Sequence, residues 1–292
     1  MSRDALGIHT LEQEDIAKLL PPRPIDSHKG KNGYALLLVG SAAYTGAALM
    51  SAAAALRVGC GVLEVAVPGA VKAAFSMLPE ACCTPVNDTG EWDGPGMERA
   101  VQQISGKRAL GLGCGMGWME DTRLIQAAIA SGLPLVIDAD GLNLLSRHRE
   151  LLDTLHNKVV LTPHPGEMAR LMACSIPEVT ADPAQTALQS ARLWHCVTLL
   201  KGAESYISDG SRVVRNVTGN PGLAKGGSGD VLTGLITGLL AQGLEPLDAA
   251  CAGAYLLGRS GDTALTLLGN RMLMAGDVIG AVEMTLNQIN NQ

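Results

Sequence analysis

The sequence predicts an α/β protein with a mostly parallel sheet covered by helices on both faces. Short branched or leucine-rich runs alternate with helical stretches along the chain, which is the pattern of βαβ units. These runs are apolar at successive positions, as expected of strands buried on both faces. These observations together predict a three-layer α/β/α sandwich. We expect a single domain over residues 1–292, because the chain contains no linker-like segment and no internal repeat.

The elements are expected in the following order. Residues 1–27 form a polar N-terminal arm that ends in Pro21-Pro22-Arg23-Pro24, which excludes helix there. Strands are predicted at Tyr34–Val39, Val62–Val67, Ala109–Leu112, Leu133–Ile137, Val159–Leu161 and Val197–Leu200. Helices are predicted over 47–58, 123–131, 183–193, 230–242, 247–258, 261–269 and 277–289. Asp209-Gly210 lies between Ser205–Ser208 and Arg212–Asn216, so an antiparallel hairpin joins the sheet.

Composition excludes several classes of protein. The net charge is −6 and no long basic run is present, so we expect no nucleic-acid partner. The N-terminus has no apolar signal core, and the longest apolar run, Gly46 to Leu56, is too short to span a bilayer. The seven cysteines are odd in number and show no paired spacing, which is typical of reduced core thiols. We therefore expect a cytoplasmic protein with no membrane contact.

The segment Asn220–Asp230, NPGLAKGGSGD, carries the strongest functional signal. Its three clustered glycines, Gly226, Gly227 and Gly229, leave backbone amides unscreened just before a predicted helix. Free N–H groups and the positive end of the helix dipole then converge on one point, which predicts a phosphate site. It is not a Walker A motif, because no Lys-Ser/Thr pair follows the last glycine.

Asp230 is the best catalytic candidate. A lone Asp at a helix start is by default an N-cap. A cap does not need a four-residue Gly-Gly-Ser-Gly loop before it, so we favour a functional carboxylate. The helix dipole is expected to keep it ionised near neutral pH.

Other polar segments follow predicted strands, where open α/β sheets bind ligands. Lys201–Ser205 follows one strand, but this segment is equally well explained as an ordinary turn. Thr162–Glu167 follows another, and Pro163 and Pro165 hold His164 in a fixed turn, which favours substrate binding over simple exposure.

Further segments are less specific. Asp138 and Asp140 follow Leu133–Ile137 and either hold Mg²⁺ through water or cap the next helix, with neither alternative preferred. The glycine turns at 40–46 and 111–117 allow a ligand to approach the backbone, but they are not a Rossmann fingerprint. His28-Lys29-Gly30 is equally well explained as an exposed basic turn.

Taken together, these segments resemble the ADP-dependent (S)-NAD(P)H-hydrate dehydratases of the ribokinase-like superfamily. The matching stretches are HKG at 28–30, GSAAYTGA at 40–47, GCGMG at 113–117, DADGLN at 138–143, TPHPGE at 162–167, KGAES at 201–205 and NPGLAKGGSGD at 220–230. TPHPGE combined with the last stretch is specific. Ser228 stands where the family more often has Thr, and Cys114 where Pro is common. Some relatives carry an additional N-terminal epimerase domain, for which we expect no room in this chain.

The resemblance implies a ribokinase-like fold and assigns residues to two ligands. ADP would contact Lys201, Gly202, Ala203, Glu204, Ser205 and Gly229. The hydrated nicotinamide nucleotide would contact Ala47, Gly115, Gly117, His164 and Asp230. No side chain is assigned as a metal ligand, although Mg²⁺ is expected with the nucleotide, and the resemblance implies a homotetramer.

The implied activity is a hydro-lyase that repairs NADH hydrate and NADPH hydrate in their S form, releasing AMP and phosphate. Phosphoryl transfer from ADP would turn a poor hydroxyl leaving group into a good one, with Asp230 as the base, amides 226–229 stabilising the phosphoryl charge and Lys201 assisting at the phosphates. The alternative is an ATP-dependent kinase of a small hydroxylated metabolite. A third possibility is a non-catalytic nucleotide sensor, which would not need the Asp230 carboxylate.

Overall fold

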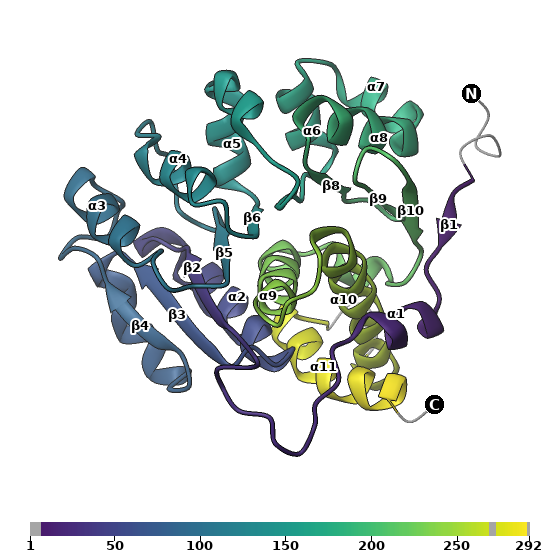
Figure 1. The fold of residues 1–292 in the computed structure, drawn as a ribbon, viewed down its shortest axis with the longest axis horizontal. Helices are drawn as coiled ribbons and strands as arrows, with labels where there is room; N and C mark the ends of the chain where they lie inside the picture. Colours follow the sequence, from purple (N-terminus) through teal and green to yellow (C-terminus); the bar gives the residue numbers. More distant parts are fainter. Residues whose placement is uncertain (1–6, 269–272, 291–292) are drawn as a thin grey trace.

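In the computed structural model, which describes residues 7–268 and 273–290, one sheet lies between two layers of helices (Figure 1). Its strands are β1 His9–Thr10, β2 Tyr34–Leu38, β3 Val62–Val67, β4 Cys82–Pro85, β5 Ala109–Leu112, β6 Leu135–Ile137, β7 Val159–Leu161, β8 Val197–Leu200, β9 Ser205–Ser208 and β10 Val213–Asn216. Their order is β1-β10-β9-β8-β7-β6-β5-β2-β3-β4. All neighbours pair in parallel except β9, which is antiparallel to β8 and β10. The predicted α/β class and hairpin are confirmed.

The helices divide between the two faces of the sheet. They are α1 Gln13–Leu19, α2 Thr45–Arg57, α3 Gly94–Gln102, α4 Arg123–Ala130, α5 Asp140–Arg147, α6 Pro165–Met172, α7 Ile176–Ala181, α8 Pro183–Trp194, α9 Ser228–Ala241, α10 Pro246–Leu268 and α11 Ala275–Asn290. One layer holds α2, α9, α10 and α11, and the other holds α3 to α8 (Figure 1). No described helix is long and apolar enough to cross a membrane.

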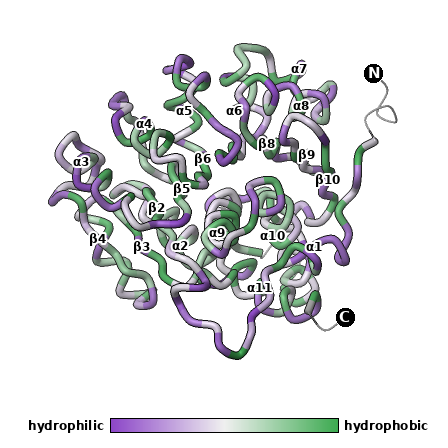
Figure 2. Tube along the Cα trace, viewed as in Figure 1, coloured by the Kyte–Doolittle hydropathy of each residue, from purple (hydrophilic) through white to green (hydrophobic). Residues whose placement is uncertain are grey.

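Strand β2 shows why the apolar runs are continuous. Ala35 and Leu37 pack in the core under α2 and α9, whereas Leu36 and Leu38 pack in the core under α3 to α8. Successive side chains of a strand point to opposite faces, so a sheet with two cores needs apolar residues at every position. Figure 2 shows hydrophobic residues along the strands and hydrophilic residues around the outer ends of α4 and α5.

Helices α2 and α9 approach each other closely, and small residues line their contact. A side-chain carbon at Gly234 would lie 2.1 Å from the carbonyl oxygen of Ser51, and one at Gly238 would lie 2.8 Å from that of Ala55. Only hydrogen fits at both glycines. These contacts fix the two helices relative to each other.

The sequence predictions were incomplete or wrong in several places, and the predicted helices did not include α3, α5, α6 and α7. The N-terminal arm contains β1 and α1, because the fully buried Ile16 anchors α1 on α10 and α11. Strand β4 was not predicted, since CCTP has a weak strand pattern. The helices predicted at 247–258 and 261–269 are the single helix α10, in which Gly261 packs on Leu223; residue 269 lies outside the described residues.

The cysteine prediction holds for most positions. All seven thiols are free, and four of them are buried. Cys82 is the exception, because it lies exposed on the edge strand β4.

Candidate active site

The polar segments predicted from the sequence meet at the carboxyl ends of the central strands. Parallel strands end at one edge of a sheet, so β5, β6, β7 and β8 bring their following loops together there. Helix α9 begins at the same edge, since Gly229 lies against the side chains that follow β6 and β8. The site is therefore assembled from segments more than a hundred residues apart in the chain.

A buried ion pair lies at the centre of this edge. Lys201, directly after β8, places its Nζ 2.8 Å from Oδ1 of Asp138, directly after β6. Asp138 also accepts hydrogen bonds from the backbone N–H of Ala139 at 2.8 Å and from Thr233 Oγ1 at 3.1 Å. Burial alone would lower the pKa of Lys201, but Asp138 and Glu167 raise it above its ordinary value. Lys201 is thus a fixed cation. Asp138 is not the cap of α5, whose N-cap is Ala139, and the predicted binding of Mg²⁺ through water remains a prediction.

Glu167 is a second carboxylate beside this lysine. Its Oε2 lies 3.8 Å from Lys201 Nζ and accepts the backbone N–H of His164 at 2.8 Å. Burial raises the pKa of Glu167 to about 7, in spite of the lowering effect of Lys201. Two buried carboxylates therefore share one ammonium group.

His164 is the N-cap of α6. Its Nδ1 accepts hydrogen bonds from the backbone N–H groups of Gly166 at 3.0 Å and Glu167 at 3.3 Å. Partial burial and the cations Lys201 and Arg170 lower the pKa of His164, so the ring is neutral at pH 7 and its proton is on Nε2. The side chain is half exposed. The Nε2 of His164 lies 3.5 Å from Glu167 Oε1, so the ring both caps α6 and contacts the carboxylate beside Lys201.

The glycine loop lies directly over the ion pair. A side-chain carbon built at Gly229 would lie 3.3 Å from Asp138 Oδ2 and 3.5 Å from Lys201 Nζ. Gly227 is the N-cap of α9 with φ +100°, a conformation that glycine adopts without strain. The free amides of the first turn and the Lys201 ammonium therefore converge, which is a favourable environment for a phosphate.

Asp230 lies in the first turn of α9, three residues after Gly227, which is the N-cap of this helix. The default N-cap interpretation is therefore wrong. Burial raises the pKa of Asp230 to about 6, against the lowering effects of Cys114 and Lys201, while Asp138 and Asp140 raise it further. The helix dipole was expected to dominate, but burial among other carboxylates outweighs it. A carboxylate with this pKa is ionised at pH 7 and is still basic enough to accept a proton.

Three of the residues predicted to bind the second ligand lie near one another around the start of α2. Gly115 has φ +62°, and a side-chain carbon there would lie 2.7 Å from the Cβ atoms of both Ala47 and Tyr44. Gly117 donates its N–H to Asp140 Oδ2 at 2.9 Å. The structure therefore brings Ala47, Gly115 and Gly117 together beside the start of α2.

The backbone between Asp138 and Asp140 is strained. Ala139 has φ +48° and ψ −115°, which a residue with a Cβ rarely adopts. Its carbonyl and amide are turned so that Asp138 faces Lys201 and Asp140 faces Gly117. A single unusual residue thus directs two carboxylates to opposite parts of the site.

A cavity of about 240 Å³ adjoins Lys201. Its walls include Gly202, Ala203 and Glu204, which come from the predicted nucleotide segment, together with Val179 and Pro183 from α7 and α8. Ser205 begins β9 at the end of the same turn. An apolar pocket next to a phosphate-binding loop can accept a planar base.

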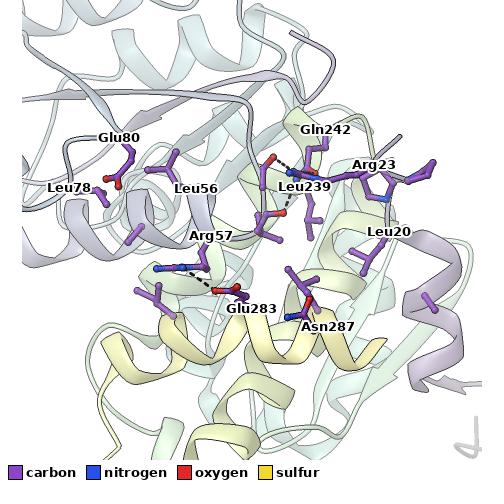
Figure 3. A pocket seen from close by; sticks show the side chains of 18 residues that line it. Leu20, Arg23, Leu56, Arg57, Leu78, Glu80, Leu239, Gln242, Glu283 and Asn287 are labelled. Carbon is purple, nitrogen blue, oxygen red and sulfur yellow. Dashed lines mark hydrogen bonds and ion pairs between the residues drawn. The ribbon is translucent and has the colours of Figure 1, made fainter. Parts of the chain in front are cut away.

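Two other features lie away from this site. His28-Lys29-Gly30 contacts Gly61 at the amino ends of β2 and β3, the opposite edge of the sheet. A cavity of about 880 Å³ lies between the arm, α2, α9 and α11 (Figure 3). Both of its arginines are engaged, Arg57 with Glu283 at 3.5 Å and Arg23 with the Gly59 carbonyl and Gln242. Neither feature contributes to the chemistry at α9.

Several site residues were not identified from the sequence. Thr233, Glu167 and the fully buried Cys114 all lie against the central ion pair or Asp230. A Glu three residues after His164 matches the pattern of a capping box, so the sequence alone does not indicate that Glu167 also contacts Lys201. The described residues contain no group of three or more His, Cys, Asp or Glu side chains that could hold a metal ion.

The sequence and the fold match known proteins over most of the chain. The family model described as NAD(P)H-hydrate dehydratase matches residues 35–278. The chain is 39% identical over 280 residues to the bifunctional NAD(P)H-hydrate repair enzyme Nnr of Moorella thermoacetica, covering 94% of this chain and 53% of that one. It thus spans about half the length of the first curated relatives that it matches. It is also 34% identical to the ADP-dependent (S)-NAD(P)H-hydrate dehydratase of Cenarchaeum symbiosum, covering 90% and 92%.

Solved structures show the same fold. The ADP/ATP-dependent NAD(P)H-hydrate dehydratase of Bacillus subtilis, co-crystallised with ATP and Mg²⁺, matches with a TM-score of 0.83 and 28% identity over 97% of this chain and 99% of that one. A ribokinase-like superfamily protein of Enterococcus faecalis matches with a TM-score of 0.86 at 24% identity, covering 98% of each chain. The predicted ribokinase-like fold is confirmed.

Proposed function

The chain belongs to the NAD(P)H-hydrate dehydratase family, and on that basis we propose that it uses ADP to dehydrate the S forms of NADH hydrate and NADPH hydrate. The products are NADH or NADPH, AMP and phosphate. The observation that carries the proposal is the convergence of Asp230, Lys201 and the first-turn amides of α9 at one point. A base, a cation and a set of amide donors are what phosphoryl transfer to a hydroxyl requires.

In the first step, Asp230 accepts the proton of the hydrate's hydroxyl as its oxygen attacks the terminal phosphorus of ADP. The bond from that phosphorus to the bridging oxygen breaks, and AMP leaves. The amides of residues 226–229 and the Lys201 ammonium stabilise the charge on the transferred group. This role fits the pKa of about 6 at Asp230, which leaves the carboxylate ionised at neutral pH.

In the second step, the new phosphate is a good leaving group. The lone pair of the ring nitrogen expels it, and loss of a ring proton restores the dihydropyridine. On the substrate side, we assign Ala47, Gly115, Gly117 and the half-exposed imidazole of His164 to binding the hydrate. On the nucleotide side, we assign Lys201 to Ser205 and Gly229 to ADP, with its base in the 240 Å³ cavity.

Mg²⁺ is expected to accompany the nucleotide. The described side chains do not form a metal site of their own, and Asp138 is already paired with Lys201. We therefore assign no step of the mechanism to a metal ion.

The test is recovery of absorbance at the reduced-nicotinamide band when the purified chain receives the S hydrate and ADP. We expect recovery in proportion to AMP and phosphate, and none without a nucleotide. A stable phosphorylated product without NADH recovery would instead support the kinase alternative. No reaction of the hydrate with either ADP or ATP would overturn the proposal.

A further inference from the structure

Beneath the glycine loop, two carboxylates each lie within 4 Å of the same ammonium group. Lys201 Nζ is 2.8 Å from Asp138 and 3.8 Å from Glu167. The side chain of Asp138 is 2% exposed and that of Glu167 is 7% exposed. Water screens such buried charges weakly, so the charge state of each group affects the others strongly.

The charge balance of this cluster is unfavourable for ADP when both carboxylates are ionised. One ammonium then faces two negative charges, and the phosphates of ADP would add more at Gly229, against Lys201. A proton on Glu167 leaves Lys201 and Asp138 as a neutral pair. The phosphates then meet the α9 amides and Lys201 without the second carboxylate opposing them.

We propose that Glu167 is a positioning residue for the nucleotide: through Lys201 it sets the charge that ADP meets, so that ADP binds to the form in which Glu167 carries a proton. This inference rests on the proposed use of ADP. A protonated Glu167 still accepts the His164 N–H through one oxygen, so the turn before α6 keeps its geometry. Burial places the pKa of Glu167 at about 7, so this proton is available near neutral pH.

The groups that face Glu167 come from several elements. Lys201 follows β8, Asp138 follows β6, and His164 and Arg170 belong to the start and the body of α6. Asp230 of α9 faces the same lysine and aspartate from the other side. The pKa of His164 is lowered and that of Asp230 is about 6, so both complete most of their titration below pH 7. Glu167 is the member of this group whose charge changes between pH 7 and 8.

The test is the affinity for ADP between pH 6 and 8, measured by calorimetry on the wild-type chain and on Glu167→Gln. Gln serves at this position of a capping box as Glu does, so the substitution removes the charge and retains the cap. The matched control is Glu178→Gln, which occupies the same position in the capping box of α7 with Ser175 and is exposed. The protonation of ADP itself changes with pH in the same way for all three proteins, so its effect cancels when their affinities are compared.

If ADP selects the protonated form, the wild-type affinity should fall on the order of ten-fold from pH 6 to pH 8 relative to Glu167→Gln. Glu178→Gln should follow the wild type. At pH 8 Glu167→Gln should bind ADP more tightly than the wild type, an effect that loss of a structural contact does not produce.

Proton uptake gives a second measurement. Binding heats at pH 7 in two buffers of different ionisation enthalpy should reveal that the wild type takes up roughly half a proton more per ADP than Glu167→Gln, because Glu167 is about half protonated there. ADP binding without this additional uptake, or parallel pH profiles for wild type and Glu167→Gln, would overturn this inference alone. A wild-type chain that binds no ADP would overturn the proposed function with it.

Discussion

Replacing Asp230 with Asn separates catalysis from folding more sharply than any other change at this site. Asn has nearly the same shape but cannot accept a proton. The N-cap of α9 is Gly227, so the substitution does not change the capping residue. The Lys201–Asp138 pair and the amides that face the phosphates remain. We therefore expect Asp230→Asn to bind ADP and to lose kcat by roughly 10²–10⁴-fold, the usual contribution of general acid–base catalysis.

The same change is expected to stabilise the folded chain above neutral pH. The pKa of Asp230 is about 6 in the folded state and 3.8 ordinarily, so the folded state holds this proton more tightly than the unfolded state. That contribution to stability is complete below pH 3.8 and is lost as the pH rises through 6. The difference corresponds to at most about 3 kcal/mol, reduced by partial solvent exposure. At pH 8 the variant should melt at a higher temperature than the wild type, and at pH 4 the two should converge.

The measurements are turnover followed by reduced-nicotinamide absorbance and thermal melts at both pH values, with and without ADP. The wild-type kcat/KM should also decline as the pH falls through 6, because the base becomes protonated. Near-normal turnover by a folded, ADP-binding variant would refute the assignment of Asp230 as the base. A lower melting temperature than wild type at pH 8 would refute the reasoning from burial.

Three further predictions concern the choice of nucleotide, the role of His164 and the packing of α2 against α9. ADP is expected to support turnover better than ATP; equal or greater efficiency with ATP in the absorbance assay would favour the kinase-like alternative. His164→Asn retains an acceptor for the α6 cap but removes the imidazole Nε2–H. It should raise the KM for the hydrate several-fold and leave the Kd for ADP nearly unchanged. Unchanged kinetics would show that His164 acts only as the N-cap of α6. Gly234→Ala places a carbon 2.1 Å from the Ser51 carbonyl and should destabilise the fold by roughly 1–3 kcal/mol or more in chemical denaturation. Its control, Gly280→Ala in α11, meets no atom within 4 Å and should be neutral or slightly stabilising.

The strands and the ligand segments could be predicted from the sequence because both depend on local pattern. Apolar runs between helical stretches gave β2, β3 and β5 to β8 to within one or two residues. Clustered glycines gave the loop before α9, and a proline on each side of His164 gave a fixed turn. Such signals lie within a few neighbouring residues.

The electrostatics of the site could not be predicted in this way. Lys201 and Asp138 are 63 residues apart, and only the strand order places them 2.8 Å apart. The pKa of Asp230 depends on how deeply several elements bury it, so the local dipole argument predicted an ionised carboxylate near neutral pH but not that its pKa is raised to about 6. The assignment of individual residues to ADP or to the hydrate, and the single-domain organisation, remain predictions.

The unusual backbone at Ala139 has a consequence for how the ligands are received. Its conformation costs about 1–3 kcal/mol, a penalty that the folded chain carries before any ligand arrives. In return, Asp138 and Asp140 are already oriented toward Lys201 and Gly117 in the free protein. The site is thus pre-organised: part of the work of aligning two substrates is done during folding, and correspondingly less of their binding energy is consumed in ordering the protein.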